Sequence, residues 1–583
     1  MTAVRMYIPR RLVALLPILA LLISMMGSSV AMAAPPANWE KIDPGLRALM
    51  ESDPRGSFEV IVEAQDLSAI GPGSQPGQTA GRAQQLIRLA GGKPGIALGL
   101  IGGASGEMKA NHIANLSRNP YVAYISHNRS FEAMDVHAQL GQVSAPTGQA
   151  VASTYTEAVG APQVWNLGYT GKGVGVAILD SGVAASNDLQ LPTNRLVASV
   201  DFVDSAQAPF TDPGGHGTHV AGIVAGNGYD SAGELTGAYK GVAPGANIIS
   251  VRVIGSDGSA KLDAIIKGIE WSVINRQTYN IRVINLSLGG IAGGPYISDP
   301  LSTAVEIAWH AGIVVVAAAG NNGPGAGTIS TPGRDPYVIT VGAVDDMGTA
   351  SLTDDLMGSF SGRGPTYDGF EKPDLVAPGR RIVSLRSPGS TLDQQLPDRV
   401  TPLVSSPSTY FRLTGTSMST PVVSGIIALM LERNPALTPD QVKFILTRTA
   451  QGVPSVTTDA RNTVGYGSAN AYAAVTSNHI DKANRGRRPS NSFARTVRPL
   501  IEGQPLVWKD PWANSINWGS INWGSINWGT ATWDNLDWDS INWGSINWGS
   551  INWGVITQET TWNSTHQDNA GQDSVPWQSA GLD

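Results

Sequence analysis

The chain of 583 residues contains no cysteine, and charged residues make up only 15% of it. Without cysteine it can hold neither a disulfide framework nor a zinc site with thiolate ligands, and no thiol can act as its nucleophile. A formal net charge of −7 at pH 7 argues against nucleic acid as a partner, because contacts with phosphate groups need a basic surface. Hydrophobic residues make up 42%, which is typical of a folded chain with a sizeable core.

The first 33 residues have the pattern of a secretory signal peptide. Three arginines at positions 5, 10 and 11 precede an uncharged apolar run over 12–26, and Ala31-Met32-Ala33 supplies the small-x-small cleavage pattern. The apolar run is shorter than the ~20 residues that a membrane span needs, so an uncleaved anchor is the less favoured alternative. We therefore expect a secreted, extracellular product, with association with the cell surface left open.

The remaining chain changes composition several times. Residues 34–150 begin with an α+β pattern, in which 58–63 alternates like a half-buried strand, and end in a polar stretch typical of a linker. In residues 151–480, short β-branched apolar runs alternate with helical stretches, which predicts an α/β domain with a mostly parallel central sheet and helices on both faces. Beyond it we expect a basic solvated linker at 481–505, a tryptophan repeat at 506–560 and a polar tail at 561–583.

Polar side chains with catalytic potential stand where the expected strands and helices meet. Asp180 follows the apolar run 176–179, at the carboxyl end of a strand, where open α/β sheets place their sites. His216, between glycines at the start of a helix, is a candidate general base. Taken alone, Asp180 fits a simple strand-end turn equally well. The spacing of His216 and His219 also suits a metal pair, although no third ligand stands nearby in the sequence.

A serine and an asparagine complete the set of candidates. Ser417 stands at the start of an expected apolar helix, where free backbone N–H groups and the positive end of the helix dipole suit a developing oxyanion. Ser417, Ser419 and Thr420 could each simply cap this helix, so position alone does not choose a nucleophile. Asn321 follows a buried apolar strand, and its amide can donate to charge that develops in a transition state. A turn asparagine is the simpler alternative.

In chain order, Asp180, His216, Asn321 and Ser417 form a set that resembles the active site of the subtilisin-like serine peptidases (subtilases, peptidase family S8). Further segments similar to that family are Gly241–Pro244, Ser287–Gly290, Phe360–Pro365 and Lys372–Gly379. The resemblance covers roughly residues 160–477 and implies a subtilisin-like α/β fold. By this likeness the serine between Gly-Thr and Met, Ser417, is the nucleophile, and the family usually has alanine where Ser419 stands.

The resemblance implies a serine endopeptidase that cleaves protein or peptide substrates through an acyl-enzyme. Asp180 would orient His216, and His216 would act as the general base for Ser417. Asn321 and the Ser417 backbone N–H would hold the oxyanion. The chemistry requires no cofactor. An extended substrate would pair by strand addition with the segment formed by Ser287, Leu288 and Gly289.

The same resemblance gives the amino-terminal segment a role. Residues 113–131 are similar to the end of the family's inhibitory propeptide, which assists folding and blocks the cleft until it is cut off. We therefore expect residues 34–150 to act as the enzyme's own inhibitor in a self-processed zymogen. The cut is expected within 133–158, without a defined bond. An unrelated α+β domain that stays attached is the alternative.

A structural calcium ion is a further expectation from the resemblance. Asp188 is similar to a calcium ligand of the family, and oxygen ligands suit Ca²⁺. The partner loop at 227–239 is longer than usual, and a surface aspartate explains Asp188 equally well. The segment 324–333 is shortened relative to the family, so specificity is left open, and an insertion at 386–411 has no role from the sequence.

A short repeat sets the carboxyl-terminal region apart. From Trp518 to Trp553 a tryptophan recurs every five residues, in the unit Ser-Ile-Asn-Trp-Gly. A period of five matches neither a helix nor a strand, so no single element of either kind keeps these rings on one face. Three interpretations stay open: attachment to the cell envelope or to glycans by ring stacking, self-association, and no defined role.

Overall fold

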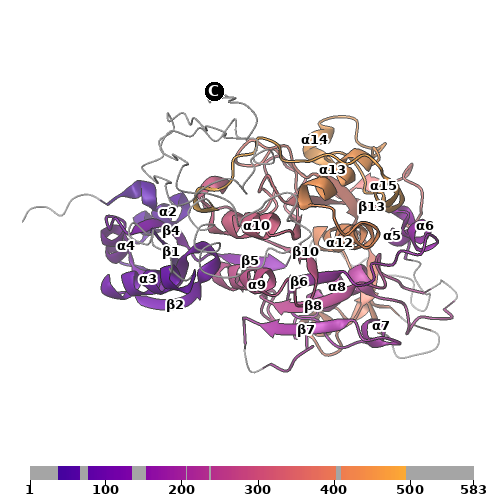
Figure 1. Cartoon of the computed structure of the whole chain (residues 1–583), viewed down its shortest axis with the longest axis horizontal. Coiled ribbons are helices and arrows are strands. Elements are labelled where there is room, and N and C mark those ends of the chain that lie inside the picture. Colours follow the sequence, from indigo (N-terminus) through magenta and orange to yellow (C-terminus); the bar gives the residue numbers. More distant parts are fainter. Residues whose placement is uncertain are drawn as a thin grey trace, which may run out of the picture.

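The computed structural model describes residues 37–65, 76–133, 153–204, 207–234, 238–401, 403 and 409–493. The expected signal peptide and tryptophan repeat lie outside these residues, as does most of the expected linker between the first two folded parts. Two parts pack against each other: an N-terminal module formed by residues 37–133 and an α/β domain formed by residues 153–493 (Figure 1). Within the described residues, no helix has both the length and the apolar character needed to cross a membrane.

The N-terminal module is an antiparallel sheet with the strand order β2-β3-β1-β4, accompanied by three helices. Its elements are β1 (Ser57–Ala64), β2 (Lys93–Leu98), β3 (Gly103–Lys109), β4 (Val122–His127), α2 (Pro44–Ser52), α3 (Pro76–Leu89) and α4 (Ala110–Leu116). Strand β1 alternates as predicted, but both of its faces are buried. Val60 and Val62 lie in the core of the module, whereas Ile61 belongs to the large core of the α/β domain. The sheet therefore uses its second face to bind the α/β domain.

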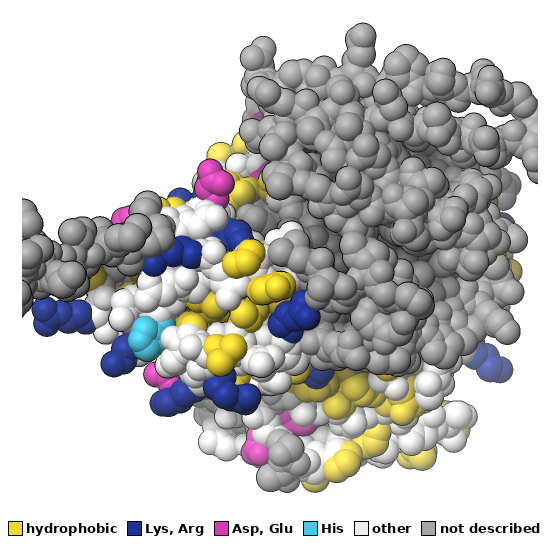
Figure 2. All heavy atoms as spheres, turned by 60° about the vertical axis from the view of Figure 1, so that its left-hand side comes forward, with side chains coloured by type: hydrophobic (Ala, Val, Ile, Leu, Met, Phe, Trp, Pro, Cys, Tyr) yellow, Lys and Arg dark blue, Asp and Glu magenta, His cyan; other side chains and the backbone are white. Residues whose placement is uncertain are grey.

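The outward face of the module has a mixed character. Figure 2 shows Lys and Arg side chains spread over it, with hydrophobic side chains in small groups between them. Arg82 lies over the ring of the half-exposed Tyr121, 5.5 Å from its centroid. On the side that meets the α/β domain, Ile61, Leu98 and Leu100 of the module are buried in the large core of that domain.

The α/β domain is built on a twisted, mostly parallel sheet, which confirms the predicted fold class for the described residues. The strand order is β14-β13-β12-β10-β6-β8-β7, with β15 beside β13, and β14 alone runs antiparallel to its neighbour. The strands are β6 (Gly175–Asp180), β7 (Leu196–Asp201), β8 (Asn247–Arg252), β10 (Ile281–Leu286), β12 (Val314–Ala318), β13 (Ile339–Asp345), β14 (Leu356–Met357) and β15 (Leu375–Pro378). Strands β6, β10, β12 and β13 are buried along their whole length, as expected for a sheet covered on both faces.

Two pairs of helices cover this sheet (Figure 1). One pair is α8 (His216–Ala225) with α12 (Thr416–Arg433), and the other is α9 (Leu262–Ile274) with α10 (Pro300–His310). Helices α8 and α12 are buried almost throughout, and α12 packs closely on the segment that follows α8: a Cβ added at Gly425 of α12 would lie 2.6 Å from Val242. The amino-terminal ends of α8 and α12 carry His216 and Ser417.

A third, short sheet joins the two parts of the chain. Strand β5 (Ser130–Ala133), the last described strand of the N-terminal module, lies between β9 (Ser259–Lys261) and β11 (Leu288–Gly289) of the α/β domain. It runs antiparallel to both, with Phe131 opposite Ala260 and Ala133 opposite Leu288. Phe131 is fully buried in the large core. The cleft between β9 and β11 is therefore filled by the chain's own strand.

The insertion at 386–411, which had no expected role, forms part of a small sheet and a helix. Strands β16 (Ile382–Leu385), β17 (Val400–Thr401) and β18 (Tyr410–Leu413) pair antiparallel, and α11 (Thr391–Gln395) follows β16. The first residues of α11 hold the loop before His216. The Thr391 N–H donates to the Pro213 carbonyl at 2.9 Å, and the Leu392 N–H donates to the Gly214 carbonyl at 3.1 Å.

The segment expected to begin a solvated linker is packed instead, up to the last described residue. The Phe493 ring lies 4.6 Å from the His310 ring, and the Ser490 N–H donates to the Glu306 carboxylate at 2.8 Å. The Ser492 hydroxyl donates to Glu63 of the N-terminal module. Of the described arginines in this segment, Arg485 and Arg487 are exposed, and Arg488 contributes its carbonyl, which accepts from the Tyr296 hydroxyl at 2.8 Å. The basic composition of this segment therefore suggested a solvated linker, although its backbone groups and serines pack against the folded parts of the chain.

Two serines of α12 differ in hydrogen bonding and give a test of the packing. Ser419 and Ser424 are both fully buried. The Ser424 hydroxyl donates to Asn285 Oδ1 at 2.8 Å, whereas the Ser419 hydroxyl has no partner among the described residues.

We expect Ser419→Ala to raise the free energy of unfolding by about 1 kcal/mol, because it removes a buried hydroxyl that makes no hydrogen bond. The matched variant Ser424→Ala should lower it by about 1–3 kcal/mol, because it leaves the Asn285 oxygen without its donor. Denaturant unfolding of the full chain measures both. Destabilisation by Ser419→Ala as large as that by Ser424→Ala would contradict this account.

Candidate active site

The candidate residues meet at one edge of the central sheet. Strands β12, β10 and β6 are neighbours and run parallel, so their carboxyl ends lie at the same edge. Asp180 is the last residue of β6, and Ser287 directly follows β10. Asn321 comes three residues after β12. The topology therefore gathers three of the predicted site residues before any side-chain contact is considered.

Asp180 holds the ring of His216. Asp180 Oδ1 lies 2.7 Å from His216 Nδ1, and both side chains are almost fully buried. The same carboxylate oxygen accepts the Ser181 N–H at 2.8 Å. This contact occupies Nδ1 and fixes the plane of the imidazole, so Nε2 is the nitrogen that can exchange a proton with a reacting group.

A second carboxylate, which the sequence interpretation missed, supports this pair. Asp212 is buried and accepts from the Ser181 hydroxyl at 2.8 Å, the Gly215 N–H at 2.7 Å and both the N–H and the hydroxyl of Thr218. Burial raises the pKa of Asp212 even with these four donors. Asp212 thereby ties the end of β6 to the first turn of α8, which carries His216. The sequence signal that could have identified Asp212 is its position, four residues before His216 in a glycine-rich turn.

The loop before His216 depends on a glycine. Gly215 has a φ of +96°, and a Cβ at this position would lie 2.3 Å from the Ser390 hydroxyl oxygen. Only glycine adopts this backbone conformation and also leaves room for the neighbouring segment. The insertion that contains Ser390 and α11 therefore packs directly on the residue that precedes the histidine.

Ser417 lies at the amino-terminal end of α12 and contacts Ser287. The Ser417 hydroxyl donates to the Ser287 carbonyl at 2.9 Å, and the Ser287 hydroxyl donates to the Ser417 carbonyl at 2.9 Å. Asn285, a buried polar residue of β10 that the sequence interpretation missed, donates to the Ser287 hydroxyl at 2.9 Å. Thr420 instead donates back to a carbonyl of its own helix. The sequence left the hydroxyl groups of Ser417, Ser419 and Thr420 as alternatives. Of these three, the Ser417 hydroxyl is the one that contacts Ser287.

Asn321 presents an amide donor beside Ser417. Its Oδ1 atom accepts both the N–H and the hydroxyl of Thr416, at 3.0 and 2.9 Å. These bonds fix the amide, and its Nδ2 atom is buried without a hydrogen-bond partner among the described residues. An oriented donor of this kind can stabilise negative charge that appears on a neighbouring oxygen during a reaction.

The expected substrate-binding segment is engaged by the N-terminal module. Leu288 and Gly289 form β11, which pairs with Ala133 and Glu132 of β5. Ser287, just before β11, is the residue whose carbonyl accepts from Ser417. The strand that fills the cleft therefore ends next to the candidate nucleophile.

The surroundings of Asp188 do not suit a calcium ion. Asp188 Oδ1 accepts the Asp230 N–H at 2.9 Å, and Oδ2 accepts the Gly228 N–H at 3.0 Å and the Tyr410 hydroxyl at 2.7 Å. Donor protons thus face the carboxylate, where a cation needs further oxygen lone pairs. The described residues also contain no group of three His, Asp or Glu side chains that could hold a metal. Backbone donors of the loop at 227–239 make two of these contacts, and no side-chain pattern in the sequence reveals such donors.

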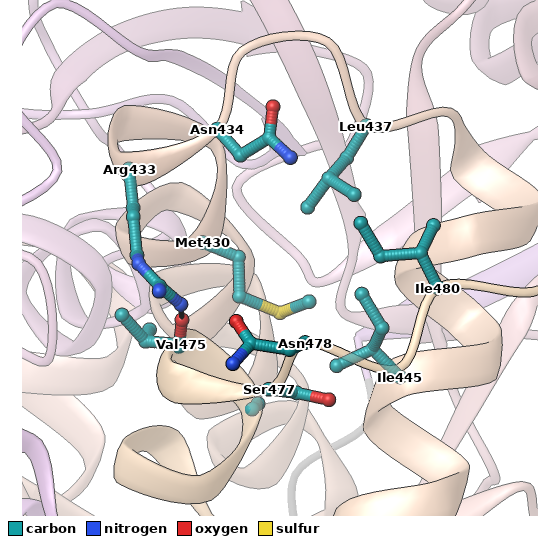
Figure 3. Close-up of a pocket in the computed structure, with 10 residues that line it drawn as sticks. Met430, Arg433, Asn434, Leu437, Ile445, Val475, Ser477, Asn478 and Ile480 are labelled. Atoms are coloured by element: carbon teal, nitrogen blue, oxygen red, sulfur yellow. Dashed lines mark hydrogen bonds between the residues drawn. The ribbon is translucent and has the colours of Figure 1, made fainter.

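A hollow elsewhere in the domain is not part of this site. It measures about 280 Å³ and lies at the carboxyl-terminal end of α12, between α13 (Pro439–Thr449) and α15 (Ala471–Thr476). Figure 3 shows mostly apolar side chains around it, with Arg433 at one side. Because a helix rises ~1.5 Å per residue, Met430 in its wall lies about 20 Å along α12 from Ser417. No acid or histidine lines the hollow, so it lacks the groups for acid–base chemistry.

The contacts of Asp188 give a test by metal removal. We expect EDTA to change the melting temperatures of the wild-type chain and of Asp188→Asn by the same amount, because donor protons rather than a cation satisfy this carboxylate. Tyr410→Phe should lower the free energy of unfolding by about 1–3 kcal/mol, because it removes the hydrogen bonds of the hydroxyl with Asp188 and Ser231. If EDTA destabilised the wild type and Asp188→Asn removed that sensitivity, Asp188 would be a calcium ligand after all.

Comparisons with known proteins show which family the chain resembles. The subtilase family, Peptidase S8, matches residues 171–471. Serine protease AprX of Bacillus subtilis (strain 168) is 45% identical over 339 residues, which cover 56% of this chain and 72% of that protein. Subtilisin E of the same organism is 33% identical over 376 residues, or 64% of this chain and 81% of that protein.

A solved structure supports the fold. Fervidolysin from Fervidobacterium pennivorans, described as a keratinolytic enzyme related to subtilisin, has a TM-score of 0.52 and 24% identity, and the match covers 73% of this chain and 61% of that chain. The family match spans more than half of the 583 residues, and it includes the candidate residues at the edge of the sheet. The chain therefore belongs to the subtilase family, and it is a serine endopeptidase that acts on proteins or peptides.

Proposed function

We propose that this endopeptidase is secreted and made as a zymogen that processes itself, with Asp180, His216 and Ser417 as its catalytic triad. The observation that carries the proposal is the position of β5. A strand of the N-terminal module lies in the cleft, in the antiparallel arrangement of a bound substrate, and ends beside Ser417. The module is the enzyme's inhibitory propeptide, and it leaves when the connection to the α/β domain is cut.

The reaction proceeds by transfer of one proton through His216. Asp180 keeps the ring oriented through the 2.7 Å contact to Nδ1 and stabilises the imidazolium. In the precursor the Ser417 hydroxyl donates to the Ser287 carbonyl, so it turns towards His216 Nε2 before it attacks. Ser417 Oγ then bonds to the carbonyl carbon, His216 takes the hydroxyl proton, and the same proton passes to the leaving amine.

Two donors receive the negative charge of the tetrahedral intermediate. Asn321 Nδ2 is buried and held without a partner among the described residues, and the Ser417 N–H lies at the amino-terminal end of α12. Both are in place before reaction, so little reorganisation is needed when the charge forms. Water then hydrolyses the acyl-enzyme with His216 as the base.

Contacts beyond β5 favour a tight propeptide. The Asp263 N–H at the start of α9 donates to Asn128 Oδ1 at 3.0 Å. Further along the same helix, Glu270 accepts the Leu100 N–H at 3.2 Å. Together with the buried Phe131, these contacts fix the register of β5 in the cleft. A strand held so firmly inhibits the enzyme and also brings the two parts of the chain together during folding.

The register suggests the bond that is cut. Ala133, the last described residue of β5, is opposite Leu288 in an antiparallel pair, and Leu288 directly follows Ser287, whose carbonyl accepts from Ser417. We propose that the enzyme cleaves the bond between Met134 and Asp135, which lies within the expected window of 133–158. The mature chain would then begin at Asp135.

The remaining proposals rest on the sequence. The signal pattern of residues 1–33 supports export, and the tryptophan repeat supports attachment of the enzyme to the cell envelope or to glycans. Self-association of the repeat is the alternative. Both segments lie outside the described residues.

Self-processing is tested by removal of the nucleophile. We expect Ser417→Ala to leave the precursor uncut, because loss of this hydroxyl typically lowers turnover by ~10⁶ in enzymes of this mechanism. Intact mass and N-terminal sequencing of the secreted product measure the outcome. The matched control Ser419→Ala, on the same helix, should mature with Asp135 as its first residue. Appearance of the mature N-terminus in Ser417→Ala, in a host free of other proteases, would contradict self-processing.

A further inference from the structure

A buried ion pair joins the two parts of the chain beside the strand that fills the cleft. Arg129 Nη2 lies 2.6 Å from Asp299 Oδ2, and the side chains are 9% and 1% exposed. Arg129 directly precedes β5, whereas Asp299 belongs to the α/β domain and caps α10 by accepting the Leu301 N–H at 3.0 Å. Burial alone would raise the pKa of Asp299, but Arg129 and Arg334 lower it below its usual value, so the carboxyl is anionic.

The α/β domain keeps an excess of negative charge at this place when the N-terminal module leaves. Arg334 lies 3.5 Å from Asp299 and also 3.5 Å from Asp368. Without Arg129, the carboxylates of Asp299 and Asp368 share the single guanidinium group of Arg334. The Asp299 carboxylate has then lost the cationic donor that lay 2.6 Å away in the precursor, so this place favours the return of a positive charge with the next bound chain.

A substrate strand can reach the position of Arg129 without the rest of the module. Strand β5 pairs with β9 through Ser130 opposite Lys261, and the Leu262 N–H continues this pairing by donating to the Arg129 carbonyl at 3.1 Å. These are main-chain contacts, which any extended peptide in the same register can make. The side chain at this position alone decides whether the Asp299 carboxylate gains a cationic donor.

We propose that Asp299 forms a cation-binding subsite at the far end of the substrate cleft. It selects proteins and peptides that carry Arg or Lys two residues before the side chain that takes the place of Phe131. The proposal rests on the proposed function, in which β5 marks the path of the substrate. In the precursor, Arg129 occupies this subsite, so the same contact strengthens inhibition by the propeptide.

Peptide kinetics with the matured full-length enzyme test the subsite. The substrates are internally quenched peptides that copy residues 128–138, with Arg, Gln or Glu at position 129. We expect kcat/KM for the Arg peptide to exceed that for the Gln peptide by about tenfold, the scale of one charge-assisted hydrogen bond. The Glu peptide should be cut more slowly still.

Two enzyme variants separate the charge of Asp299 from its structural role. Asp299→Asn keeps the ability to cap α10 but removes the charge, so the ratio of kcat/KM for the Arg and Gln peptides should fall to about one by loss of that hydrogen bond. The control Asp263→Asn removes an acid at the start of α9, near Asn128, that does not contact Arg129. It should keep the wild-type ratio.

The outcomes distinguish the subsite from the proposed function. Equal cleavage of the three peptides by the wild type would overturn the subsite and leave the peptidase mechanism intact. Cleavage of none of them would contradict the proposed substrate path itself, and the subsite would fall with it. An equal loss of preference in Asp263→Asn and Asp299→Asn would also overturn the proposal. Since the wild-type order of Arg, Gln and Glu is a test by itself, the result does not depend on the folding of a variant.

Discussion

The contact between Asp180 and His216 sets the requirements for much of the structure around it. A carboxylate and an imidazole 2.7 Å apart, almost without exposure to solvent, persist only if their surroundings fix both groups, because burial of charge is costly without good geometry. Asp212 provides one support by joining the end of β6 to the start of α8. The insertion provides another through α11, which holds the loop before His216. The active-site geometry thus depends on segments well outside the triad.

The second constraint belongs to the proposed function: one cleft binds both the propeptide strand and the substrate. The N-terminal module buries Phe131 and the second face of β1 against the α/β domain, so it is part of the core of the precursor. Its strand β5 uses the main-chain contacts that a substrate needs. In the proposed zymogen, stability of the precursor and inhibition of the enzyme therefore have the same physical origin. Loss of the module exposes apolar and charged surface together, including the Asp299 carboxylate.

The sequence predicted the features that follow from the pattern of apolar residues and from the order of motifs along the chain. The parallel strands and the residues that gather at the sheet edge followed from apolar runs and from motifs at their ends. It did not predict the sheet of β5, β9 and β11, because strands of two to four residues from distant segments have no periodicity of their own. Asn285 and Asp212 were missed as single polar residues. The contacts of Asp188 were not predicted, because they are mainly with backbone donors, which no side-chain pattern reveals.

The central claim is that Ser417 becomes a reactive nucleophile when β5 leaves the cleft. A fluorophosphonate probe tests it directly in a sample that contains both precursor and processed chains, with intact mass and peptide mapping as the measurement. The account predicts one adduct, on Ser417, in chains that have lost the N-terminal module, and little or none in uncut chains. Absence of an adduct on Ser417 in processed chains, or equal labelling of uncut chains, would contradict it.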